Sequence, residues 1–192
     1  MYIASQKKKE NIAEYILYMW QVEDLLRANG LDIDRLRKTL LDRFDSLDAA
    51  SRRELEDWYE SLADMMRREG KEKSGHLQIN INTLSQIDEL HRLMLRSPKY
   101  PQYSAEYYKT LPFLVELRSR QGDNKLDEME TCFTALYAAL MLRLQGRPIS
   151  EGTQQALDQI SRLLAMLARY WRLDAENRLF EPDEDPRNAV KP

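Results

Sequence analysis

Apolar side chains recur every three or four residues along most of this 192-residue chain, and few residues interrupt the pattern. That spacing puts apolar residues on one face of an α-helix, whereas a half-buried strand needs strict alternation. Only 6 glycines and 7 prolines punctuate the chain, and strand-rich folds need more turns than that. The sequence therefore predicts an all-α fold.

The pattern and its breaks predict six or seven helices. Asn29-Gly30 ends the first, because glycine adopts the left-handed conformation that often closes a helix. Residues 77–81 alternate like a strand, but the longer stretch also fits one helical stripe, and a lone strand would have no partner. We therefore expect a helix there. The expected helices cover residues 5–28, a segment from Asp32 or Asp34, a segment from Asp48 or Ser51, residues 76–96, 104–120 (capped by Ser104), 126–145, and a last segment from Ser150.

The segment 126–145 is apolar on nearly every side between Cys132 and Leu142. A helix without a polar face belongs in the middle of a fold, and an uncharged run of this length is too short to span a bilayer. We expect one bundle-like domain over residues 1–180 with this helix at its centre. Residues 181–192 form an acidic, proline-containing tail, which we expect to be disordered or draped on the surface.

Composition argues against several classes of function. The formal net charge is −3, whereas proteins that bind nucleic acid through phosphates usually carry a basic excess or stripe. Cys132 is the single cysteine, so no internal disulfide can form. The first residues contain no apolar signal-peptide segment. These features predict a cytoplasmic protein that associates with neither nucleic acid nor membrane.

Several segments resemble a bacterial family of domains of unknown function. They are KKKENIAEYILYMWQVEDLLRANGLDID near the start, GHLQI followed by DELHRLML, and TLPFLVELR. The resemblance extends over most of the chain apart from the tail. It implies an all-helical cytosolic domain, and it implies no functional residues because the family has no assigned activity.

Five residues are candidates for a ligand site between helices. Asp88 and His91 have the i, i+3 spacing that puts an acid and a histidine on one face of a helix. A buried histidine held by a hydrogen bond explains His91 equally well. Glu23 lies near an apolar stripe, where a carboxylate must find a partner or change its pKa. The candidate ligand-binding residues are Glu14, Tyr18, Glu23, Asp88 and His91.

Two further features can each be explained by packing alone. Cys132 lies in the most apolar segment, which indicates an inert thiol in the core. Four of the ten tyrosines lie within nine residues beside two prolines. They are a candidate interaction surface, or else they cover the end of the bundle. These tyrosines are Tyr100, Tyr103, Tyr107 and Tyr108.

The leading hypothesis is a non-catalytic helical scaffold or interaction module that self-associates as a homodimer. We expect its interface on an outer helix or on the tyrosine-rich segment, and not on the helix over residues 126–145. The alternative is a small-molecule or metal site between helices, with or without enzymatic activity, at which Glu14, Glu23, Asp88 and His91 would converge. No motif for a common hydrolase or nucleotide-binding fold occurs, and we expect no metal and no cofactor.

Overall fold

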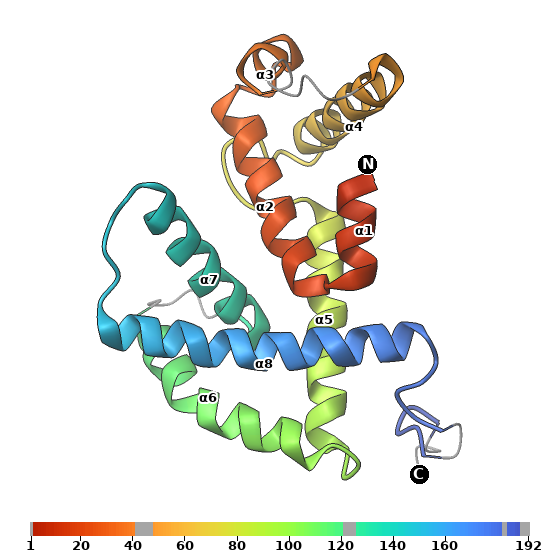
Figure 1. The fold of residues 1–192 in the computed structure, drawn as a ribbon, viewed down its shortest axis with the longest axis vertical. Helices are drawn as coiled ribbons and strands as arrows, with labels where there is room; N and C mark the ends of the chain where they lie inside the picture. Colours follow the sequence, from red (N-terminus) through yellow and green to blue (C-terminus); the bar gives the residue numbers. More distant parts are fainter. Residues whose placement is uncertain (1, 41–47, 121–125, 182–183, 189–192) are drawn as a thin grey trace. The chain divides into compact units, whose positions relative to one another are not determined.

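A computed structural model describes residues 2–40, 48–120, 126–181 and 184–188 of the chain. These residues contain eight helices and no strand (Figure 1). The chain divides into two compact units. The first unit comprises residues 1–8 and 14–82, and the second comprises residues 9–13 and 83–192. The all-α prediction is confirmed, and the single domain over residues 1–180 stays a prediction.

The first unit contains α1 (Tyr2–Glu10, except its last two residues), most of α2 (Ile12–Ala28), α3 (Ile33–Thr39), α4 (Ala49–Arg68) and the start of α5 (Gln78–Arg96). The predicted single helix over residues 5–28 is wrong, because the chain breaks at Asn11. The Asn11 side chain accepts a hydrogen bond from Ala13 N at 3.1 Å, which starts a new helix. This break accounts for the eighth helix.

Short polar side chains fix where two of these helices begin. The Asp32 carboxylate accepts hydrogen bonds from the first turn of α3, and Asp48 does the same for α4. Gly30 has a φ of 67°, so it supplies the left-handed residue expected after α2. The stretch that alternates like a strand belongs to α5 and the residue before it.

The second unit contains the rest of α5, α6 (Pro101–Ser119), α7 (Glu128–Leu144) and α8 (Glu151–Ala175). In this unit α6, α7 and α8 pack pairwise on one another (Figure 1). Ser104 does not cap α6 as predicted, since the helix begins earlier, at Pro101. Proline suits the first position of a helix because its N–H would have no partner there. The helix continues through Pro112.

The predicted central helix is not the most buried one. The buried residues of α7 are Met129, Thr131, Cys132, Phe133 and Ala139, whereas α8 buries eight residues. The later apolar side chains of α7 are half-buried, and Leu144 is 70% exposed. A helix can be apolar on every side without having another helix packed against each side. The expectation of a central α7 is therefore corrected.

Candidate functional site

The first polar cluster surrounds Glu23 in the first unit. This carboxylate is fully buried within the apolar stripe of α2. Its Oε1 accepts hydrogen bonds from Leu77 N at 2.9 Å and from Asn80 Nδ2 at 2.7 Å. Its Oε2 lies 2.6 Å from His76 Nδ1. Because α5 begins at Gln78, directly after Leu77, Glu23 places a negative charge at the N-terminus of this helix, where it is stabilising.

Aromatic rings and an arginine complete this cluster. The Trp20 ring stacks on His76 with centroids 4.2 Å apart. Burial, and then the charge of Glu23, raises the pKa of Tyr15. Arg27 donates to the carbonyl oxygens of Lys71, at 3.2 Å, and of Gly75. These contacts connect the segment before α5 to α2, so we interpret the cluster as structural.

The other candidates on α2 have different partners. The Glu14 side chain is 58% exposed and pairs with Lys7 Nζ at 2.8 Å. The Tyr18 ring stacks on Trp58, and burial raises its pKa. Glu14, Tyr18 and Glu23 thus lie in three separate environments, and their role in ligand binding stays a prediction.

The second polar cluster surrounds His91 in the second unit. His91 Nδ1 lies 2.6 Å from Tyr103 Oη, and both residues are buried. His91 Nε2 lies 3.5 Å from Glu128 Oε2, and within the described residues it has no hydrogen-bond partner. The 3.5 Å between His91 Nε2 and Glu128 Oε2 is within reach of an ion pair but long for a hydrogen bond, so the two observations are consistent. Burial lowers the pKa of His91, and the nearby Glu128 opposes that shift.

Glu128 connects the helices around this histidine. Its Oε2 accepts a hydrogen bond from Tyr107 Oη at 2.9 Å, and its Oε1 lies 3.6 Å from Arg118 Nη1. Burial, and then the bond to Glu128, raises the pKa of Tyr107 to about 12. Burial raises the pKa of the Cys132 thiol to about 12 as well, so it stays protonated and unreactive at neutral pH.

Asp88 lies on the same helix as His91 but forms a different contact. Its Oδ2 pairs with Arg92 Nη2 at 2.6 Å. Burial raises the pKa of Asp88 in spite of that pairing, and the charges of Asp127 and Glu128 add to the shift. Among the described residues, no three histidine, cysteine or acidic side chains are placed to share a metal ion.

The tyrosine-rich segment turns mostly inward. Tyr103 is fully buried, and Tyr100 donates a hydrogen bond to the carbonyl oxygen of Leu179. Tyr107 bonds to Glu128, and Tyr108 is 67% exposed. Three of the four candidate tyrosines therefore pack within the second unit, as covering of the bundle would require.

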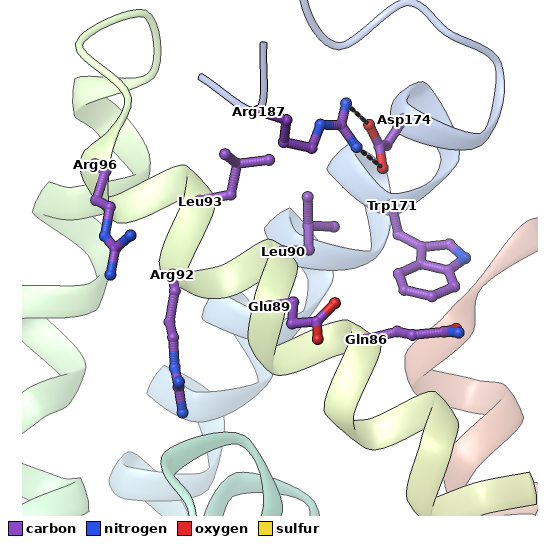
Figure 2. Close-up of a pocket in the computed structure, with 9 residues that line it drawn as sticks. All are labelled: Gln86, Glu89, Leu90, Arg92, Leu93, Arg96, Trp171, Asp174 and Arg187. Atoms are coloured by element: carbon purple, nitrogen blue, oxygen red, sulfur yellow. Dashed lines mark hydrogen bonds and ion pairs between the residues drawn. The ribbon is translucent and has the colours of Figure 1, made fainter. Parts of the chain in front are cut away.

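A pocket of about 560 Å³ opens in the second unit, between α5, α8 and the chain end (Figure 2). Leu90 and Leu93 of α5 and Trp171 and Asp174 of α8 line it, and Arg187 of the tail extends over it. We call this the Trp171 pocket. Two hydrogen bonds join the Arg187 guanidinium to the Asp174 carboxylate. The described tail residues, 184–188, thus lie on the surface of this unit, while residues 182–183 and 189–192 of the predicted tail lie outside the described part.

Sequence reasoning missed the partners in each cluster. Asn80 and His76 complete the Glu23 cluster, Glu128 completes the His91 cluster, and Arg187 closes the pocket. His76 is the first residue of the predicted helix over residues 76–96, and a polar side chain at a helix start was a usable signal for it. The other partners are far away in sequence, so no local pattern could indicate them.

Comparison with known proteins identifies a family and no activity. A family model described as "Domain of unknown function (DUF4924)" matches residues 1–178. This confirms the resemblance to a family of unknown function. No curated protein and no solved structure matches the chain. Within the described residues, no helix combines the length and hydropathy that crossing a membrane requires.

Proposed function

Because the chain belongs to the DUF4924 family, which carries no assigned activity, we propose from its geometry that it is a non-catalytic helical interaction module that self-associates. The single cysteine, which leaves no internal disulfide, fits a reducing compartment, and we propose a cytoplasmic location. The polar clusters around Glu23 and His91 support the non-catalytic role, since most of their polar atoms bond to one another.

The observation that carries the proposal is the partly uncovered apolar surface of α7. Side chains four residues apart share one side of a helix, as Leu136, Leu140 and Leu144 do, and Tyr137 and Met141 form a second such row beside them. Leu144, at its end, is 70% exposed, and the four others on that side are half-buried. Exposed apolar surface of this kind marks an interaction site. This α7 face consists of Leu136, Tyr137, Leu140, Met141 and Leu144.

Charge on α7 favours a second copy of the chain as the partner. Its first turn contains Glu130, on the side of the apolar face, and its last turn contains Arg143, whereas Glu128 bonds to Tyr107 within the unit. If two copies pair antiparallel about a two-fold axis, the acidic turn of one lies beside the basic turn of the other. Two-fold dimers are the commonest soluble assemblies. We therefore propose α7 as the interface, which reverses the expectation of an outer helix or the tyrosine-rich segment and not the helix over residues 126–145, because the later part of α7 is partly exposed and three of the four tyrosines pack inward.

Light scattering coupled to size exclusion tests this proposal. At about 100 µM we expect roughly twice the 22.7 kDa chain mass. Leu144→Glu should give a monomer that keeps its helical circular dichroism. Ala138→Glu is the matched control, because Ala138 is also exposed but lies on another side of α7. A monomeric native protein would reject self-association, and an unchanged dimer in Leu144→Glu would reject the α7 interface.

One observation favours a second candidate function. His91 Nε2 is buried without a hydrogen-bond partner among the described residues, and Glu128 and Tyr107 lie beside it. Buried polar atoms usually bond to protein or to an ordered molecule. A small polar ligand at this point would satisfy Nε2, which is the alternative of a binding site between helices. Elemental analysis and mass spectrometry of gently purified protein would detect a retained ligand that His91→Ala removes.

A further inference from the structure

We propose that Asp174, at the edge of the Trp171 pocket, is a binding site for a guanidinium group, and that the chain's own Arg187 occupies it. The occupant from another molecule would be an arginine side chain in a peptide that forms the turn seen in residues 185–188. This inference concerns the second unit only and does not depend on self-association through α7.

The contact between Arg187 and Asp174 has the geometry of guanidinium recognition. Arg187 Nη2 lies 2.8 Å from Asp174 Oδ1, and Nη1 lies 3.2 Å from Oδ2. Two parallel bonds between planar groups are specific to arginine, because a lysine ammonium is a point charge. The Asp174 side chain is 28% exposed, so water screens it only in part. The site therefore selects for a planar guanidinium as well as for positive charge.

A second carboxylate prepares the arginine for this contact. Asp185 Oδ1 accepts hydrogen bonds from Arg187 N and Nε, both at 2.9 Å, and its Oδ2 accepts one from Nη2 at 2.8 Å. These bonds within one short segment hold the guanidinium in a single orientation. Arg187 is therefore pre-organised, as a peptide ligand of this site would have to be.

The open part of the pocket, which Arg187 borders and does not fill, has walls that suit an arginine side chain. Trp171 lies one helical turn before Asp174 on α8 and is half-buried. Figure 2 shows its indole and the side chains of Leu90 and Glu89 around the space below the Arg187–Asp174 pair. Apolar walls and an aromatic ring accommodate a methylene stem and a flat cation. Glu89 adds a second negative charge.

Positive charge at the rim does not oppose a cation strongly. Arg92 and Arg96 also line the pocket, but in Figure 2 their side chains extend from the other side of α5 from Trp171. Arg92 is neutralised by Asp88, at 2.6 Å. The acidic groups Asp174 and Glu89 are those that lie toward the indole.

The site lies within the segment that the family model matches, and Arg187 lies beyond that segment. Trp171 and Asp174 fall within the matched segment, residues 1–178, whereas Arg187 falls beyond it. Lys99 pairs with Glu184 at 2.9 Å, which gives the tail a second contact with the second unit. A tethered segment competes with free ligand at an effective concentration of roughly millimolar. The tail therefore acts as a built-in competitor for arginine-bearing peptides.

The test deletes the tail that carries Arg187 and measures whether the same residues bind when they are added as a free peptide. The probe is the capped pentapeptide Glu-Asp-Pro-Arg-Asn, residues 184–188, and indole NMR shifts measure its binding. We expect the protein lacking residues 183–192 to bind it, and the full chain to bind it about tenfold more weakly. If the shortened chain fails to fold, full-length Arg187→Ala replaces it, because it frees the same site.

Two comparisons make the test specific. Asp174→Asn in the shortened protein should abolish binding, whereas Glu176→Gln, a nearby exposed carboxylate, should not change it. A peptide carrying Arg187→Lys should bind several-fold more weakly. Equal binding of the two peptides, equal binding by Asp174→Asn, or no binding to the shortened protein at millimolar peptide would overturn the proposal and leave an ordinary surface ion pair.

Discussion

Glu23 of α2 accepts a hydrogen bond of 2.9 Å from the backbone N–H of Leu77, the residue that precedes α5. A carboxylate from one helix thus supplies the cap that the sequence next to α5 does not provide. The buried charge also accepts a hydrogen bond from Asn80 and contacts His76, so its removal would leave several polar groups unpaired.

The first prediction follows from that buried charge. Glu23→Ala should lower the free energy of unfolding by about 3 kcal/mol or more, because breaking a buried ionic contact leaves its partners unsatisfied. Glu14→Ala is the matched control on the same helix; its exposed pair with Lys7 should contribute less than about 1 kcal/mol. Urea unfolding of the two variants measures the difference, and similar losses in both would contradict the role given to Glu23.

The second prediction concerns pH. Burial lowers the pKa of His91 below its ordinary value of 6.5, so the unfolded chain takes up a proton at a higher pH than the folded chain does. The stabilisation from neutral His91 is therefore complete above pH 6.5 and is lost as the pH falls toward the folded-state pKa. Unfolding measured at pH 7.5 and 5.5 should show a larger loss for the native protein than for His91→Gln. Equal losses would show that His91 does not titrate in this way.

The third prediction concerns Cys132. The side chain is fully buried and burial raises its pKa to about 12, so a thiol reagent needs the chain to open before it can react. At pH 8 the native protein should react about a thousandfold or more slowly than the urea-unfolded chain. Rapid stoichiometric labelling of folded protein would place the thiol at the surface.

Helix content was predictable because it follows from local periodicity. Residues 77–81 illustrate the rule, since the longer apolar stripe decided correctly between strand and helix. The break at Asn11 was missed because asparagine is tolerated within a helix and caps one only when its side chain turns back to the backbone.

Burial and pairing were less predictable than the helices. The apolar composition of α7 indicated a central helix, but Leu144 is mostly exposed, because composition says nothing of how many neighbours a helix has. Glu23 and His91 were recognised as polar residues on apolar faces. Their partners Leu77 and Glu128 lie on other parts of the chain, and only the fold brings them together.

The last prediction separates the tail from the residues just before it. The described tail residues are held by two ion pairs at the surface, of Lys99 with Glu184 and of Arg187 with Asp174, and such pairs contribute about 1 kcal/mol or less because water screens them at least in part. Deleting residues 183–192 should therefore lower the melting temperature by about 2 °C or less. Leu179, in contrast, is 1% exposed, and Leu179→Ala should cost about 2–3 kcal/mol, which corresponds to a fall of several degrees. Differential scanning calorimetry of both variants makes the comparison. A drop of several degrees on deletion alone would mean that the tail is an integral part of the second unit, and a negligible effect of Leu179→Ala would mean that the buried boundary lies before it.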